Sequence, residues 1–222
     1  SSAASDVYKR QIGDSVILYT QDGKVLKQEE VSSYPCVGED RPGLRYFRSV
    51  RTTGLNENTV VALFSARPLN TGTSYMKMWM PASSDVSYFT ALAPGAKTAS
   101  SPYQNKPSLV VTMRKEKTAV KEPFVAVYEP ISDKVSAGLI ESVDRVKLDP
   151  QGEEGCAIKV NTKEGDTFTL VNILKDGPVI LDNQKCCADF AIFAKQKGQS
   201  IVYVGNGSFV ENKEFKVESE NR

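Results

Sequence analysis

The chain has 222 residues, of which 28 are basic and 27 acidic, so its formal net charge is +1, and it contains no histidine. With 40% hydrophobic and 25% charged residues, the composition argues against a disordered or collagen-like chain. The balanced charge offers no basic field to nucleic acid, and no apolar stretch reaches the roughly 20 residues of a membrane helix. Without histidine, the commonest general base and metal ligand is missing. We therefore expect a globular protein with no nucleic-acid partner and no membrane span.

The first residues, SSAASDVYKRQ at 1–11, are unlike the rest of the chain. They lack an initiator methionine and an apolar region, so they do not form a signal peptide. The segment resembles a translated sequencing adapter, which predicts that 1–14 is artefactual or disordered and that the natural protein extends upstream. A disordered native N-terminus is the alternative.

From Ser15 onward, short apolar or alternating runs are separated by turn residues, which is typical of strands rather than helices. Asp22-Gly23 follows the first run and predicts a hairpin. In chain order we expect strands at 16–20, 44–52, 59–67, 74–80, 86–92, 108–114, 124–128, 139–148, 155–160, 166–173, 188–195, 200–206 and 208–212. Only 185–195 also fits helical spacing, and its neighbours favour a strand there.

The spacing of these strands, with no helices between them, predicts an all-β fold. We expect an antiparallel two-sheet β-sandwich of about a dozen strands. A single domain over 15–214 and a frayed tail at 215–222 complete the predicted organisation. The weakly patterned stretch Ala93–Pro107 fits a long surface loop better than a linker, and GNG at 205–207 predicts a hairpin turn.

The most apolar run, within KEPFVAVYEP at 121–130, ends on a carboxylate. Five consecutive apolar residues predict a strand at 124–128 with both faces covered and with the flanking prolines bracketing it. Glu129 is then expected at the strand's rim, where solvent or a loop amide satisfies it. The chemical alternative is a glycosidase pair formed by Glu129 with Glu141 or Asp144.

The four cysteines, Cys36, Cys156, Cys186 and Cys187, show no C-x-x-C spacing. In the absence of histidine a zinc site would need all four thiolates, so we expect no metal and no cofactor. Cys186 and Cys187 are adjacent, which favours buried small side chains over a bridge between them. A disulfide from Cys36 to Cys186 or Cys187 stays open.

Arginines supply the first candidate binding residues, because a guanidinium presents a planar fork that matches carboxylate or sulfate. Arg41, Arg45 and Arg51 are the candidates, although pairing with nearby acids is the commoner role of such residues. Strand alternation predicts that Val50 lies on the face opposite Phe47 and Arg51.

Aromatic residues are the second group of candidates for substrate binding. In SYMKMWM, alternation puts Tyr75 and Trp79 on one face, where they could stack on a sugar. A core position for Trp79 is the favoured interpretation. No serine stands in G-x-S-x-G, and P-loop and dinucleotide motifs are absent from the sequence, so we assign no catalytic residue.

Six stretches, taken in order, resemble the C-terminal β-sandwich region of the heparinase II/III-like polysaccharide lyases: GLRYFRSVRTT, YMKMWMP, PSLVVTMRKE, PFVAVYEP, LIESVDRVKL and ADFAIFAKQKGQSIVYVGNG. The resemblance covers most of the chain from Gly43 to Gly207 and rests on packing patterns rather than catalytic signatures. In that family F-V-A-V-x-E-P is an internal strand followed by a loop, which agrees with a structural role for Glu129.

The resemblance implies a lyase that pairs a helical α/α toroid with this sandwich and cleaves uronic-acid polysaccharides by β-elimination. Its tyrosine and histidine catalysts lie on the toroid and the upstream part of the sandwich, and no residue here matches those motifs. We therefore expect a non-catalytic C-terminal sandwich of a secreted or periplasmic bacterial lyase, with the upstream toroid of the same natural chain and an acidic polysaccharide as partners. The alternatives are a carbohydrate-binding module, using Tyr75, Trp79, Tyr103 and the early arginines, and a structural cell-surface sandwich.

Overall fold

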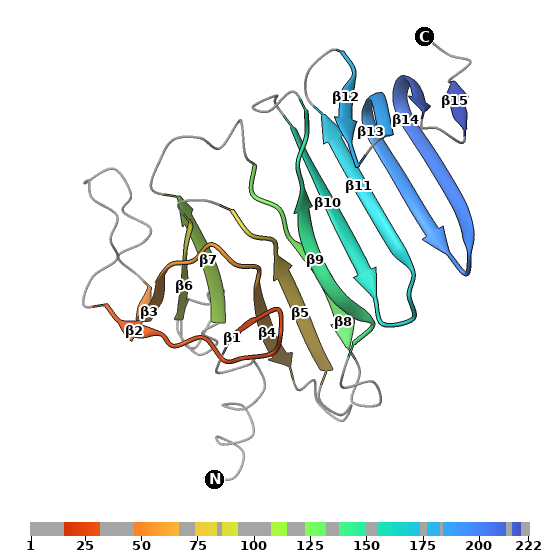
Figure 1. Ribbon diagram of the computed structural model, residues 1–222. Coiled ribbons are helices and arrows are strands. Elements are labelled where there is room, and N and C mark those ends of the chain that lie inside the picture. The colour runs from red at the N-terminus through yellow and green to blue at the C-terminus, as the bar shows by residue number, and fades with distance from the viewer. Residues whose placement is uncertain are drawn as a thin grey trace, which may run out of the picture. The chain divides into compact units, whose positions relative to one another are not determined.

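The computed structural model describes residues 16–31, 47–66, 74–83, 86–92, 108–114, 123–131, 138–149, 155–173, 177–182, 184–211 and 215–218. Every regular element in these ranges is a strand (Figure 1), and the strands form three antiparallel sheets. The all-β, antiparallel class expected from the sequence is confirmed, in an arrangement consistent with a β-sandwich. No helix in the described ranges is long and apolar enough to cross a membrane.

Contacts within the chain group the strands into two compact units, which are described separately. The first holds β1 to β8, apart from Met80 and Val127, and the second holds β9 to β15. Each unit is assembled from three separate chain segments. The single domain expected over 15–214 stays a prediction.

The first sheet of the first unit has the order β1-β4-β5-β8. Its strands are β1 (Ile17–Thr20), β4 (Val60–Ala66), β5 (Ser74–Met80) and β8 (Val127–Ile131). The Asp22-Gly23 hairpin is confirmed, since Gly23 has a φ of 86° and Tyr19 bridges to Val25. Buried Leu18 and Val60, at 1% and 0% exposure, anchor the first two strands in the core.

The apolar run around Glu129 differs from its prediction. The strand is β8, so Glu129 and Pro130 lie inside it rather than beyond its end. A proline is tolerated here because β8 is an edge strand of its sheet. Alternation is confirmed, but the expectation that both faces are covered is wrong: Phe124 and Tyr128 are 52% and 62% exposed, while Ile131 is buried.

The second sheet of this unit has the order β2-β3-β6-β7. Its strands are β2 (Glu29–Glu30), β3 (Arg48–Leu55), β6 (Val86–Leu92) and β7 (Ser108–Arg114). Simple alternation along β3 is wrong, because Phe47 and Val50 pack in one cluster with Phe89 and Ala91. The physical cause is Ser49, whose φ of 52° accompanies a shift of register between β3 and β6.

The second unit is a seven-stranded sheet in the order β15-β14-β13-β11-β10-β9, with β12 also paired to β13. Its strands are β9 (Ile140–Val146), β10 (Gly155–Thr162), β11 (Thr167–Ile173), β12 (Val179–Leu181), β13 (Gln184–Gln196), β14 (Gln199–Glu211) and β15 (Lys216–Glu218). The strand expected within 185–195 is confirmed against the helical alternative. Lys216–Glu218 pair with β14, within the stretch for which the sequence predicts a frayed tail.

The GNG motif does not form the expected hairpin turn. It lies inside β14, where Asn206 has a φ of 51° and the register to β13 shifts between Cys187 and Ala188. A Cβ on Gly207 would come within 2.3 Å of the Ala188 Cβ, so this bulge requires a glycine. The hairpin turn is instead at 197–198, where both residues have positive φ.

Candidate functional site

Of the five binding residues proposed from the sequence, three lie in the described part of the chain: Arg51, Tyr75 and Trp79. Arg41 and Arg45 lie outside the described residues, as does Tyr103 of the carbohydrate-binding alternative. All three described candidates belong to the first unit. They lie on two strands of different sheets, Arg51 on β3 and the two aromatic residues on β5.

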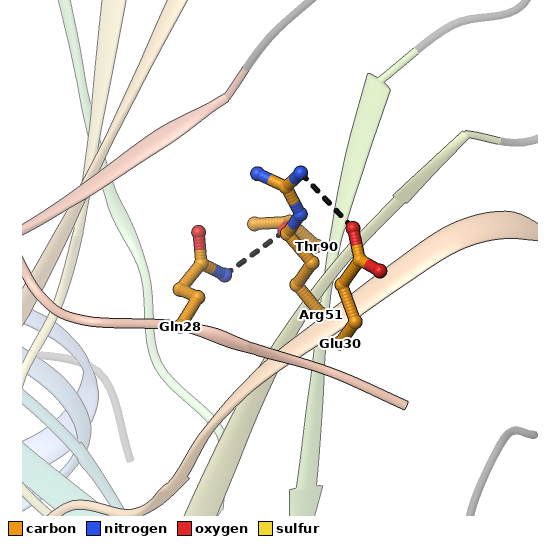
Figure 2. A network of polar contacts seen from close by, with 4 residues as sticks. All are labelled: Gln28, Glu30, Arg51 and Thr90. Atoms are coloured by element: carbon orange, nitrogen blue, oxygen red, sulfur yellow. Dashed lines mark hydrogen bonds and ion pairs between the residues drawn. The ribbon is translucent and has the colours of Figure 1, made fainter. Parts of the chain in front are cut away.

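Arg51 belongs to a polar row that crosses three neighbouring strands. The register places Glu30 of β2 opposite Arg51, and Arg51 opposite Thr90 of β6. Figure 2 shows the Arg51 guanidinium turned toward Glu30, with 3.3 Å between Nη2 and Oε1, and Gln28 reaching Thr90. The Gln28 amide donates to the Thr90 hydroxyl at 2.9 Å. We call Gln28, Glu30, Arg51 and Thr90 the polar row.

The polar row has a part with little access to water, where Gln28 meets Thr90, and an exposed part, the charges of Arg51 and Glu30. Thr90 is buried at 8% exposure, so Gln28 satisfies a hydroxyl that has little access to water. The Arg51 and Glu30 side chains, in contrast, are 54% and 80% exposed. Since exposed ion pairs exchange readily with solvent, an incoming carboxylate or sulfate can replace Glu30 on the guanidinium. The row therefore presents an exposed cation that an anionic group can reach.

Trp79 lies in the core, the position that the sequence analysis favours over one in which the ring stacks on a sugar. The indole is 3% exposed, and its Nε1–H donates to Glu129 Oε2 at 3.1 Å. Lys77 lies over the same ring, with its Nζ 5.6 Å from the centroid. We call Lys77, Trp79 and Glu129 the indole cluster. Because the ring is buried, it cannot present a face to a sugar, whereas Tyr75 at the start of β5 is half-buried.

Glu129 corrects the prediction of a solvated rim position. Its side chain is 7% exposed, so it is not solvated, and its Oε2 accepts a hydrogen bond from the indole N–H of Trp79. Gly138 packs so closely that a Cβ there would lie 2.5 Å from Glu129 Oε1. Buried carboxylates need such partners, since an unpaired one is strongly penalised. The indole cluster therefore fastens edge strand β8 to β5.

The two carboxylates considered as glycosidase partners of Glu129 lie in the second unit. Glu141 is exposed on β9. Asp144 accepts a hydrogen bond from the Ser142 hydroxyl at 3.0 Å, and Asn161 donates to that same hydroxyl at 2.7 Å. These contacts form a half-buried polar network on two neighbouring strands.

The three cysteines that the structure describes lie in the second unit. Cys156, Cys186 and Cys187 are free thiols, and Cys36 lies outside the described residues. Burial, with a smaller contribution from neighbouring Cys187, raises the pKa of the Cys186 thiol to about 11. Burial also raises the pKa of Cys156, partly opposed by Arg145. Thiols shifted in this direction are poor nucleophiles, and the described residues hold no group of three or more potential metal ligands.

The sequence did not identify the partners of its candidate residues. Glu30 follows Glu29, and an acidic pair is a weak signal for an arginine partner. Glu30 and Arg51 are, however, far apart along the chain. Which arginine Glu30 meets depends on the register of β2 and β3, which places Glu30 opposite Arg51. The Trp79–Glu129 bond likewise follows from the adjacency of β5 and β8, which no local pattern specifies.

Comparison with known proteins gives one informative similarity. No protein-family model matches the chain, and no solved structure matches it. The chain is similar to an endo-acting ulvan lyase of Formosa agariphila, with 29% identity over 226 aligned positions. It is a distant relative of a polysaccharide lyase. The alignment covers 97% of this chain but 27% of that lyase, so the chain spans about a quarter of the relative's length.

Proposed function

We propose that this chain is a non-catalytic β-sandwich region of a polysaccharide lyase that cleaves a uronic-acid polysaccharide by β-elimination. The observation that carries the proposal is the similarity to an ulvan lyase over 97% of this chain and only 27% of that enzyme. The remaining length of the relative leaves room for catalytic parts outside the region matched here. The substrate of the parent protein is proposed to be an acidic polysaccharide.

The chemistry of β-elimination supports a catalytic centre elsewhere. The reaction needs a neutralised carboxylate, a base that removes the C5 proton and an acid for the leaving oxygen. The chain has no histidine. Among the described residues, the buried carboxylate of Glu129 accepts from Trp79, and the charge of Arg51 is paired with Glu30. Glu129 is buried and a guanidinium has no acceptor atom, so neither group is an accessible base for the C5 proton.

The finer part of the proposal concerns the whole natural protein. We propose membership in the heparinase II/III-like group, with a helical α/α toroid upstream in the same chain that carries the catalytic residues. The sandwich would support that toroid, and the parent enzyme would be secreted or periplasmic in a bacterium. The six strand motifs named above support this assignment, and recovery of the upstream coding sequence tests it.

The direct test is to incubate the purified 222-residue chain with ulvan, heparin, alginate and chondroitin, and to follow unsaturated product by ultraviolet absorbance. We expect no product above a protein-free blank for any of the four. Sustained turnover of any one of them would overturn the non-catalytic assignment. A commercial lyase for each substrate verifies that the assay detects product.

The second candidate function is carbohydrate binding by the isolated chain, favoured by the exposed guanidinium of the polar row. Affinity electrophoresis in gels that contain each polysaccharide measures it. If Arg51 binds an anionic sugar, Arg51→Ala abolishes the retardation. Glu30→Gln, which removes the competing carboxylate, strengthens it. Arg48→Ala is the matched control, an exposed arginine on the same strand. Equal migration of the Arg51→Ala variant and the wild type would exclude this role for Arg51.

A further inference from the structure

In the part of the chain that the structure describes, the outer edge of β14 is open along most of its length. On one side β14 pairs with β13 from Gln199 to Glu211. On the other side β15 pairs only with 209–211, and Figure 1 shows it beside one end of β14. Among the described residues, no strand pairs with this edge over 199–208. The backbone groups on that side therefore have no partner strand.

Open edges usually carry features that prevent pairing, such as a lysine, a proline or a bulge. The segment 199–208 reads QSIVYVGNGS and contains neither a charge nor a proline. The bulge at Asn206 to Ser208 lies at the end next to β15, which leaves 199–205 regular. An edge with this composition is a template for another uncharged, extended strand.

The side chains of this edge are held in place and exposed. Ile201 and Tyr203 lie on one face of the sheet and are 49% and 56% exposed. The Tyr203 ring covers Gly205, since a Cβ there would lie 3.1 Å from Tyr203 Cε1. Phe190 of β13 contacts the same ring edge-to-face, with 6.1 Å between the centroids. A partner strand thus meets an ordered apolar surface, which lowers the entropic cost of binding.

We propose that this edge pairs with the same edge of a second copy of the chain, in an antiparallel two-fold arrangement centred on Val202. The register then places Ile201 of each copy opposite Tyr203 of the other, and Val202 opposite itself. Aromatic and β-branched residues opposite each other are favourable cross-strand pairs. Because the segment is uncharged, the two copies meet without repulsion, and a charged peptide is not selected.

The two ends of the open edge limit the assembly to a dimer. The hairpin turn at 197–198 ends the edge on one side, and β15 occupies it beyond 208 on the other. A two-fold contact uses the same patch on both copies, so it closes after two. The product is one continuous sheet through both second units.

Sedimentation equilibrium of the full chain over a concentration series tests the proposal. We expect a concentration-dependent species of twice the 24.3 kDa chain mass and nothing larger. Ile201→Lys/Tyr203→Lys places like charges opposite each other and should weaken dimerisation at least about 100-fold. Ile201→Lys/Tyr203→Glu places opposite charges in the same positions, so it should restore the dimer despite equal loss of apolar surface.

Controls distinguish pairing in this register from nonspecific association through exposed apolar side chains. Ile180→Lys changes an isoleucine that is 48% exposed on β12 and should leave the dimer unchanged. Far-ultraviolet circular dichroism and thermal unfolding verify that each variant folds. A wild type that stays monomeric throughout, species larger than a dimer, or equal association of the two double variants would each overturn the proposal.

Discussion

The indole cluster makes the sharpest prediction about stability. Glu129→Ala removes a carboxylate that is 7% exposed and leaves the indole N–H of Trp79, 3% exposed, without this acceptor. A buried donor without a partner costs about 1–3 kcal/mol, and the void adds about 1–2 kcal/mol. Relief from burying the carboxylate offsets part of this sum. We expect a net loss of about 3 kcal/mol in the free energy of unfolding.

Urea unfolding followed by tryptophan fluorescence measures this loss, because Trp79 is the chain's single tryptophan. The corresponding fall in Tm is about 6–12 °C for a chain of this length. Glu129→Gln keeps an oxygen that accepts from the indole, so its cost should be about 1 kcal/mol. Glu30→Ala, at an 80% exposed carboxylate, should cost less than about 0.5 kcal/mol. If Glu129→Ala unfolds at the same urea concentration as Glu30→Ala, the indole cluster does not stabilise the contact between β5 and β8.

Three further predictions follow from single positions. Gly138→Ala should lower the free energy of unfolding, measured in urea, by about 1–3 kcal/mol more than Gly165→Ala does. Both glycines have a positive φ, but only a Cβ at 138 would meet Glu129. Equal losses in the two variants would contradict this contact. Burial raises the pKa of the Cys186 thiol from 9.0 to about 11, so the unfolded chain loses this proton at a lower pH than the folded chain does. The contribution of the protonated thiol to stability is therefore complete below pH 9 and is lost as the pH rises from 9 to 11. Between pH 8 and 11, the free energy of unfolding of the wild type should fall by about 2–3 kcal/mol more than that of Cys186→Ala, and parallel profiles of this free energy against pH would refute the prediction. Arg51→Ala should change stability by less than about 1 kcal/mol, since its ion pair is exposed, and a larger loss by calorimetry would give the polar row a structural role.

The strands that the sequence predicts best are β5, β6 and β7, each of which follows turn-forming residues in the sequence. The predicted bounds of β5, β6 and β7 agree with the structure, and the Asp-Gly pair correctly predicts the hairpin at Gly23. Local composition is sufficient there, because β-branched and aromatic runs favour a pleated, half-buried surface and glycine favours a positive φ.

Errors arose where non-glycine residues adopt a positive φ. At Ser49 and Asn206 the backbone enters the left-handed region, with φ of 52° and 51°, and each accompanies a shift of register. Such a bulge reverses the face of every later residue, so Phe47 and Val50 share a core that alternation would separate. Nothing in the local sequence around Ser49 specifies this conformation.

The candidate sites depended on contacts between distant segments, which sequence patterns do not encode. The sequence predicts Arg51 as a possible anion ligand, yet its partner Glu30 follows from the register of β2 and β3. The proline next to Glu129 predicts the end of a strand there. In the structure the edge position of β8 accommodates that proline and brings the carboxylate to Trp79.

Our central proposal is that this chain is part of a polysaccharide lyase but does not itself carry out the elimination. The most direct measurement is the rate of unsaturated product formation from ulvan by the purified chain, beside the Formosa agariphila lyase at equal molar concentration. We predict a rate equal to the protein-free blank for the chain and rapid product formation by the lyase. Product formation by the chain that scales with its concentration would contradict the claim.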